Sequence, residues 1–141
     1  MTFEELAKLK SGTILKDWYD DGIRYLIMRG PCALCAYFGI PIDHPLAGSS
    51  YDDLPVGCHG GLTFGSEGDG EMRPAGFYWY GWDYAHSGDK SFYNLDDGYE
   101  GLLGDKAWTL KAVEEDVNWN SYEIKRLVKL AERIANKEPN P

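Results

Sequence analysis

The sequence predicts an α+β fold, in which a mostly antiparallel sheet with long glycine-rich loops packs against helices on one face. Two observations lead to this prediction. Apolar and aromatic runs of strand length stand between turn residues at 23–30, 32–40 and 77–85. Apolar residues at helical spacing mark both ends of the chain. With 141 residues the chain has the length of one domain with a core, so we expect a single domain over 1–141.

The N-terminal part, residues 1–39, is expected to begin with a short helix. Thr2 followed by Glu5 fits a capping box, which predicts a helix over 3–10. Residues 11–22 then carry turn signals around two short apolar runs.

The strands of the sheet are expected in the three longest apolar runs. The run 23–30 is apolar almost throughout, which predicts a strand covered on both faces. Gly30 and Pro31 form a turn into the next strand, over 32–40. The aromatic run 77–85 is the best candidate for a central strand.

The middle segment, residues 40–105, is rich in glycine, histidine and aromatic residues. Prolines and glycines crowd 41–61 and predict an ordered loop. A short strand at 62–64 and a turn at 65–76 follow, and 86–106 is expected to be a second long loop. The candidate site residues are expected in this segment, because loops at the edge of a sheet commonly carry function.

The C-terminal segment, residues 106–138, is expected to form helices. A first helix is predicted over 107–120, with Asn118 and Asn120 weakening its end. Asn120 fits the cap of a second helix. The core-facing stripe of that helix is expected to hold Ile124, Leu127, Val128, Ala131 and Ile134.

The net charge of −9 is concentrated in the middle segment. Residues 40–105 contain 12 acidic residues and only two basic ones, Arg73 and Lys90. Such a field repels phosphates, which argues against generic nucleic-acid binding. The N-terminus does not resemble a signal peptide, and no apolar run approaches the ~20 residues of a membrane helix. With three cysteines, an odd number, we expect a soluble cytoplasmic protein without a disulfide framework and without membrane contact.

The cysteines permit a zinc interpretation, which the pattern disfavours. Cys32 and Cys35 have the spacing of a zinc knuckle, and Cys58 with His59 would complete a Cys₃His set. A knuckle needs a tight turn between its thiolates, whereas a strand would point Cys32 and Cys35 to opposite faces. Three buried small apolar side chains are therefore the favoured interpretation.

The motif His59-Gly60-Gly61 permits two interpretations. The glycines allow positive φ, and their amides would form an anion-binding nest beside the His59 ring. Alternatively they make a turn into the next strand, which His59 caps. The sequence leaves both open. These three residues and Thr63 of the same motif are candidate ligand-binding residues.

His44 is a further candidate in the preceding loop. It stands before Pro45, which favours an extended conformation and so defines the direction of the ring. Asp43, Asp52 and Asp53 lie nearby in the sequence and are typical of Asx turns. We therefore expect the aspartates to be structural and keep His44 as a candidate.

The stretch 77–89 joins a strand to three polar residues. Alternate side chains of a strand share a face, so one face is expected to carry Trp79, Gly81 and Asp83 and the other Tyr78, Tyr80, Trp82 and Tyr84. The aromatic row is either core or a wall on which a ligand stacks, with Tyr80 and Trp82 as candidates. Gly81 beside Asp83 predicts a hollow on the opposite face.

Two further candidates follow that strand. His86 stands at its end, and Asp89 is placed to cap the turn that follows. If His44, His59, Asp83 and His86 converge, they suit Zn or another divalent metal. The same groups, next to aromatic side chains and glycine backbone, equally suit a polar planar ligand without a cofactor.

Five segments occur in a recognisable order: LCAYFGIP, HPLAGSSYDDL, HGGLTF, GWDYAHSGD and AWTLKAVEEDV. Together they resemble an uncharacterised family of small bacteriophage and prophage proteins, over residues 24 to 117. The matching positions are Cys35, His44, Pro45, Tyr51, His59, Gly60, Gly61, Asp83, His86 and Asp89. Cys32 and Cys58 depart from the pattern, which further weakens the zinc interpretation. The resemblance implies a phage-type accessory protein in the host bacterial cytoplasm, and brings no activity or ligand with it.

Small accessory phage proteins often act on the host, and some sequester or destroy nucleotide signals of host immunity. By analogy, the first expectation is a protein that binds a small, polar, nucleotide-like ligand. His59 and the two glycines would hold an anionic or hydroxyl group, and Asp83 and His86 would orient the ligand. An aromatic residue between Tyr78 and Trp82 would stack on the base.

Two alternatives belong to other classes. A metal-dependent hydrolase would use the three histidines and Asp83 as ligands of a metal that activates water. An acidic decoy would dock on a basic host protein through Asp96, Asp97, Glu100 and Asp105. The sequence leaves open whether a ligand is turned over and which oligomer forms.

Overall fold

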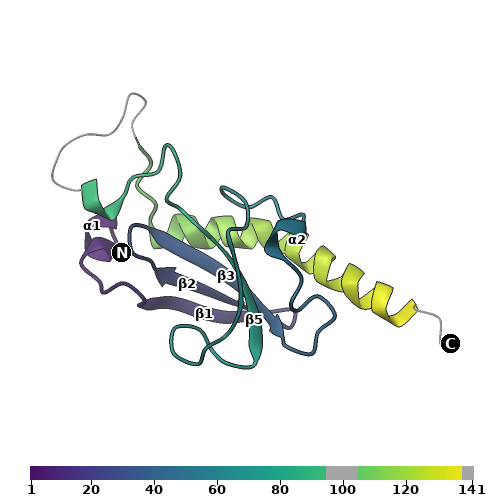
Figure 1. The fold of residues 1–141 in the computed structure, drawn as a ribbon. Coiled ribbons are helices and arrows are strands. Elements are labelled where there is room, and N and C mark those ends of the chain that lie inside the picture. Colours follow the sequence, from purple (N-terminus) through teal and green to yellow (C-terminus); the bar gives the residue numbers. More distant parts are fainter. Residues whose placement is uncertain (95–104, 138–141) are drawn as a thin grey trace.

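A computed structural model of the protein describes residues 1–94 and 105–137 (Figure 1). An antiparallel sheet of five strands forms the centre, in the order β1-β2-β3-β5-β4. A short helix precedes the sheet and a long helix follows it, which confirms the α+β class. The elements are α1 (Phe3–Ala7), β1 (Ile14–Asp20), β2 (Ile23–Arg29), β3 (Leu34–Pro41), β4 (Phe64–Glu67), β5 (Phe77–Asp83) and α2 (Leu110–Lys137).

The N-terminal helix begins as its capping box predicts. The Glu5 amide donates to the Thr2 hydroxyl at 3.1 Å, and the Glu5 side chain accepts from the Thr2 amide at 3.1 Å. Two amides that lack helical partners are thereby satisfied. Phe3 and Leu6 then bury their side chains in the core.

The first strand was not expected. Residues 14–20 form β1 and pair with β2, where the prediction had only turn signals and short apolar runs. The connection is the dipeptide Asp21-Gly22, whose residues have φ of 54° and 78°. Two consecutive residues with positive φ match the right-handed twist of a hairpin, and Asp-Gly is a preferred sequence for it. This dipeptide was the available signal for the hairpin.

The C-terminal segment forms one continuous helix rather than the two that were predicted. Asn118 and Asn120 do not end it. Asn120 is buried, and the hydroxyl of Ser121 donates to the Asn118 carbonyl at 2.7 Å. One buried stripe runs past these residues without a change of phase: Val113, Val117, Asn120, Ser121, Ile124 and Val128. Burial of that stripe against the sheet outweighs the weak helix propensity of asparagine.

The long helix covers one face of the sheet and extends beyond it (Figure 1). Its 28 residues correspond to roughly 42 Å of rise, whereas a strand of about seven residues spans roughly 23 Å. Residues 132–137 are accordingly exposed on every side. Ile134 is therefore exposed, and its expected place in the core is wrong.

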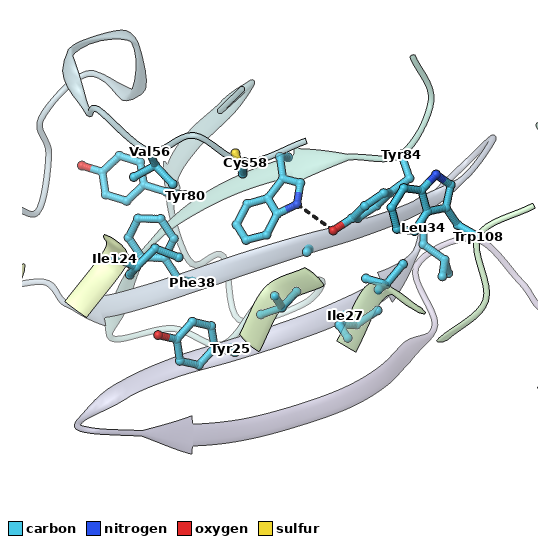
Figure 2. Close-up of a cluster of buried hydrophobic side chains, with 14 of the residues drawn as sticks. Tyr25, Ile27, Leu34, Phe38, Val56, Cys58, Tyr80, Tyr84, Trp108 and Ile124 are labelled. Atoms are coloured by element: carbon cyan, nitrogen blue, oxygen red, sulfur yellow. Dashed lines mark hydrogen bonds between the residues drawn. The ribbon is translucent and has the colours of Figure 1, made fainter. Parts of the chain in front are cut away.

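The predicted alternation of β5 is confirmed. Tyr80, Trp82 and Tyr84 point towards α2 into the main core, as Figure 2 shows for the tyrosines, and Trp79 belongs to a smaller cluster on the opposite face. That second cluster contains Leu26, Met28 and Tyr37, and the loop after β4 covers part of it, because the Trp79 indole donates to the Pro74 carbonyl at 3.0 Å. Within the described residues, none of the helices is long and apolar enough to cross a membrane.

Candidate functional site

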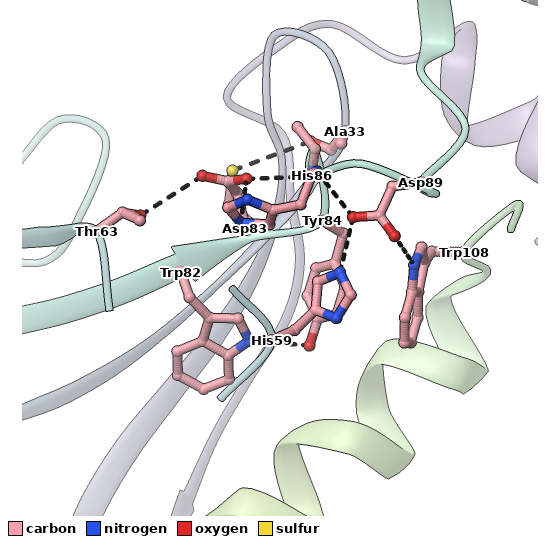
Figure 3. Close-up of polar contacts among 11 residues, drawn as sticks. Ala33, His59, Thr63, Trp82, Asp83, Tyr84, His86, Asp89 and Trp108 are labelled. Atoms are coloured by element: carbon pink, nitrogen blue, oxygen red, sulfur yellow. Dashed lines mark hydrogen bonds and ion pairs between the residues drawn. The ribbon is translucent and has the colours of Figure 1, made fainter. Parts of the chain in front are cut away.

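The candidate site lies where β5 ends and two loops meet. The first loop contains His59 and its glycines, and the second runs from His86 to Asp89 (Figure 3). Asp89 lies at the centre of the polar contacts. One of its oxygens accepts from His59 Nε2 at 2.7 Å and from the His86 amide at 2.9 Å, and the other accepts from the Trp108 indole at 2.8 Å.

These three donors determine the ionisation of Asp89. Its side chain is only 4% exposed. Burial raises the pKa of Asp89, but the hydrogen bonds from His59, from the His86 amide and from Trp108 outweigh it and hold the pKa below its ordinary value. The carboxylate is therefore charged at neutral pH, and it orients the His59 ring.

The His59 ring packs against two aromatic side chains, which also contact each other with a centroid distance of 4.6 Å. It stacks on Tyr84 with a centroid distance of 5.0 Å and an interplanar angle of 12°, and it meets Trp108 edge-on at 5.0 Å. The Tyr84 hydroxyl accepts from the Trp82 indole at 2.9 Å and donates to Asp116 on α2 at 2.7 Å. These contacts fix the ring while leaving the side chain 29% exposed.

His86 packs against the glycine turn. Its Nε2 lies 3.3 Å from Asp83 Oδ1, within ion-pair distance, but the geometry does not make a hydrogen bond and this nitrogen is buried without another partner. A Cβ placed on Gly60 would collide with the His86 ring, and Gly60 has a φ of 70°. The close approach of the ring and the positive φ both require glycine here.

The glycine motif makes a turn. The Gly61 amide donates to the Cys58 carbonyl at 2.9 Å, so it is already used and is not free for the two-amide nest, one of the two interpretations left open by the sequence. Gly61 also has positive φ, at 77°, but open space surrounds the position of its missing Cβ. The turn interpretation is therefore the one that the geometry supports, with His59 bound to Asp89 rather than to the local backbone.

Asp83 faces away from the main core, on the side that the alternation predicted. It is one-third exposed, accepts from the Ala85 amide at 3.1 Å and lies 3.5 Å from the Thr63 hydroxyl. Beside it is a depression of about 310 Å³. The residues that line this depression are Cys35, Tyr37, Thr63, Phe64, Trp82 and Asp83.

Aromatic side chains and a cation also border this depression, on the face away from α2. The Tyr37 ring fills the space above Gly81, where a Cβ would lie 2.5 Å from it, so the expected hollow is displaced towards Asp83. Tyr37 and Phe64 meet edge-on at 5.6 Å. The Arg73 guanidinium lies 4.3 Å from the Phe64 ring centroid and 5.2 Å from that of Tyr37. Its Nε is buried without a hydrogen-bond partner among the described residues.

Three residues that line the depression, Cys35, Tyr37 and Phe64, were not predicted as site residues, and neither was the adjacent Arg73. A signal existed for Arg73, which is one of only two basic residues in the acidic middle segment. None existed for Tyr37 and Phe64, because only the pairing of β3 and β4 with β5 brings them together. Burial, with a smaller effect of the Asp83 charge, raises the pKa of the Cys35 thiol to about 11.

Two of the predicted ligand-binding residues are buried in the core. Tyr80 and Trp82 are 0% and 1% exposed, so their rings belong to the core and not to a stacking wall. The Tyr80 hydroxyl donates to carbonyls of the loop, to Leu46 at 3.1 Å and to Ser49 at 2.7 Å. Neither buried ring offers a face to a ligand, although Trp82 is one of the residues that line the depression beside Asp83.

His44 does not join the other histidines. Its Nε2 lies 3.0 Å from Glu132 near the C-terminal end of α2, and its Nδ1 accepts from the Leu46 amide at 3.0 Å. Trp108, which contacts His59, precedes the other end of that helix, and the intervening 22 residues from Leu110 rise roughly 33 Å. The set of His44, His59, Asp83 and His86 is therefore not assembled.

The described residues do not form the ligand set that either metal interpretation requires. In 1–94 and 105–137, no group of three or more His, Cys, Asp or Glu side chains is arranged to hold a metal ion. The three cysteines are free thiols, Cys58 is buried, and burial raises the pKa of Cys58 to about 12. Of the acidic residues expected for a decoy, Asp96, Asp97 and Glu100 lie outside the described residues, and Asp105 is half-buried.

Comparisons with protein-family models, with curated proteins and with solved structures found no match. The resemblance to bacteriophage proteins therefore stays a sequence-based expectation, and the site must be interpreted from its own chemistry.

Proposed function

We propose that this protein binds a small, polar, nucleotide-like ligand in the depression beside Asp83. The observation that supports the proposal is the combination of unlike groups around one depression: a carboxylate, two aromatic rings and a guanidinium whose Nε has no partner. Its volume of about 310 Å³ is at the lower end of the range for ligand pockets. A ligand that satisfies all of these groups must be planar in one part and polar in others.

The carboxylate and the hydroxyl define the polar part of the ligand. Asp83 offers an oxygen to donors such as ribose hydroxyls or the amino group of a base. Thr63, 3.5 Å away, both donates and accepts. Tyr37 and Phe64 present aromatic surface next to these groups, which suits a base. In this arrangement Tyr37 and Phe64 take the stacking role expected for an aromatic residue between Tyr78 and Trp82.

The guanidinium of Arg73 supplies positive charge next to the depression, where a phosphate would otherwise be repelled by the acidic segment. The middle segment is strongly acidic, which disfavours anions unless a local cation compensates. Arg73 is the nearby cation that would compensate, because its guanidinium lies against the Phe64 ring and would pair with a phosphate or another anionic group. The end of β5 next to Asp83 is held by the contacts among His59, His86 and Asp89. These contacts are present without a ligand.

The biological role we propose rests on the resemblance to phage accessory proteins. A phage protein with this site would sequester a nucleotide signal of host immunity in the bacterial cytoplasm. Binding is sufficient for such a role, so the proposal requires no catalytic group and no cofactor.

A thermal-shift panel followed by calorimetry tests this proposal. The panel contains nucleosides, nucleoside monophosphates, cyclic nucleotides, ADP-ribose derivatives and inorganic phosphate alone. A true ligand at about 100 times its Kd is expected to raise Tm by about 5–10 °C. If no member of the panel raises Tm of the folded protein, the nucleotide-like ligand is wrong.

Variants then locate the site. Asp83→Asn keeps an oxygen for the Ala85 amide but removes the charge, and we expect it to weaken binding about tenfold or more. Arg73→Gln should weaken phosphate-bearing ligands more than nucleosides. Asp52→Asn is the matched control, because Asp52 is an exposed acid in the same segment. Equal effects of Asp83→Asn and Asp52→Asn would place the ligand elsewhere.

A further inference from the structure

A second surface of the molecule, separate from the candidate site, lies on α2. A groove of about 920 Å³ runs along this helix on its solvent side, bounded on one edge by the loop at Pro55 and Gly57. The Gly57 amide donates to Glu123, which fastens that loop to the helix. The groove is independent of the depression beside Asp83, which lies on the opposite side of the sheet.

Large apolar side chains line this groove although they face solvent. Trp119 is 76% exposed and Tyr122 70% exposed, and Leu130 lies further along the same side. Positions 119, 122, 126, 130 and 133 are three or four residues apart, so they form one stripe along the helix. Because the opposite stripe of α2 is already buried on the sheet, this second stripe has no role in the fold of the chain.

The charge of this stripe is opposite to that of the protein. From 120 to 137 the helix carries five basic residues and two acidic ones, in a chain with a net charge of −9. Both acids are engaged, Glu123 with the Gly57 amide and Glu132 with His44. Two of the basic residues, Lys125 and Lys129, pair with Asp20 and Asp21. In the described part of the chain, Arg126 and Arg133 have no carboxylate within ion-pair distance.

From these observations we infer that the groove on α2 binds an acidic, amphipathic segment of a partner protein. Aromatic residues and arginine at the centre of an exposed groove are the residue types that contribute most to protein interfaces. Leu130, Tyr122 and Trp119 would receive apolar side chains spaced by three or four residues, as in other helix-in-groove contacts. Arg126 and Arg133 would receive carboxylates that flank them, which gives the site its selectivity for acidic segments.

Two other occupants fit the surface less well. A second copy of this chain, paired through the same stripe about a twofold axis, would bring Arg126 and Arg133 of the two copies towards one another. A nucleic acid would place phosphates on Arg126 and Arg133, but it would not use the apolar side chain of Leu130. Both are outcomes that the experiment distinguishes.

Peptide display on the full-length chain tests this inference without a known partner. A random library of peptides of about 20 residues, long enough for a helix, is selected on the immobilised protein. We expect the enriched sequences to be acidic and to repeat apolar residues every three or four positions. Enrichment of basic or uncharged sequences, or no enrichment, would overturn the inference.

An enriched peptide is then titrated against variants. The double variant Arg126→Glu/Arg133→Glu should lose at least tenfold in affinity. The control Lys10→Glu/Lys111→Glu changes the net charge equally at exposed lysines outside the groove, and it should bind as the wild type does. Tyr122→Ala should weaken binding, whereas Tyr93→Ala, at an equally exposed tyrosine, should not. If the control variants lose as much as the groove variants, the inference fails.

Fluorescence and light scattering complete the test. Trp79, Trp82 and Trp108 are buried, and the half-buried Trp18 does not line the groove, so a peptide in the groove should shift the emission through Trp119. A dimer of the free protein that Arg126→Glu/Arg133→Glu dissociates would make the second copy the occupant. If an oligonucleotide binds the wild type but not the same variant, nucleic acid is the occupant. Either result would overturn the inference of an acidic protein partner.

Discussion

His59 Nε2 lies 2.7 Å from a carboxylate oxygen of Asp89, thirty positions further along the chain. This contact joins the glycine turn after Cys58 to the turn that follows β5. Trp108, just before α2, donates to the other oxygen of the same carboxylate. One buried acid thus connects three segments, and the stability of the site should depend on it.

We expect Asp89→Asn to destabilise the protein by about 2–4 kcal/mol. Both oxygens of Asp89 accept hydrogen bonds from N–H groups, so in either orientation the NH₂ group of the asparagine replaces an acceptor and points at an N–H donor. The lowered pKa of Asp89 also sets a pH dependence. The stabilisation is present above the pKa of the unfolded state and is lost as pH falls through the lower folded pKa. Urea denaturation between about pH 2 and 7 should show a smaller loss of stability on acidification in the variant. Asp52→Asn is the control. If Asp89→Asn loses as much stability at low pH as the wild type does, Asp89 is not the source of this pH dependence.

The two glycines of the turn should respond differently to substitution. Both have positive φ, so alanine at either costs about 1–2 kcal/mol in backbone strain. Only at Gly60 would the added Cβ collide with His86, whereas the space at Gly61 is open. Gly60→Ala should therefore lower the free energy of unfolding clearly more than Gly61→Ala, and shift the NMR signals of the His86 ring. Equal losses in the two variants would mean that His86 does not pack on the turn.

The thiol of Cys35 should report the charge of Asp83. With a pKa of about 11, only about one thousandth of this thiol is ionised at pH 8, so alkylation should be slow. Burial is the main cause of the raised pKa and the Asp83 carboxylate adds to it. Asp83→Asn should lower the pKa and speed alkylation of Cys35 by roughly twofold to tenfold. Mass spectrometry after timed labelling measures this, with Asp52→Asn as the control. A slower reaction in Asp83→Asn would contradict the assignment.

Local patterns determined much of the secondary structure. The capping box at Thr2 and the alternation along β5 are read from neighbours a few positions apart, and both are confirmed. The same pattern explains the failure at Asn118 and Asn120, where local propensity predicted a break. A buried stripe against the sheet decided the continuous helix, and burial is a property of the tertiary structure.

The sequence by itself singled out His59, Asp83, His86 and Asp89, because histidines and carboxylates gather there on glycine loops and at a strand end. Only the tertiary structure decided which of them meet: His59 binds Asp89, His44 binds Glu132, and Tyr37 covers Gly81. Periodicity specifies the face on which a side chain lies, but not which strand becomes its neighbour. Because β5 inserts between β3 and β4, residues far apart in the chain share one depression, and no local pattern encodes that pairing.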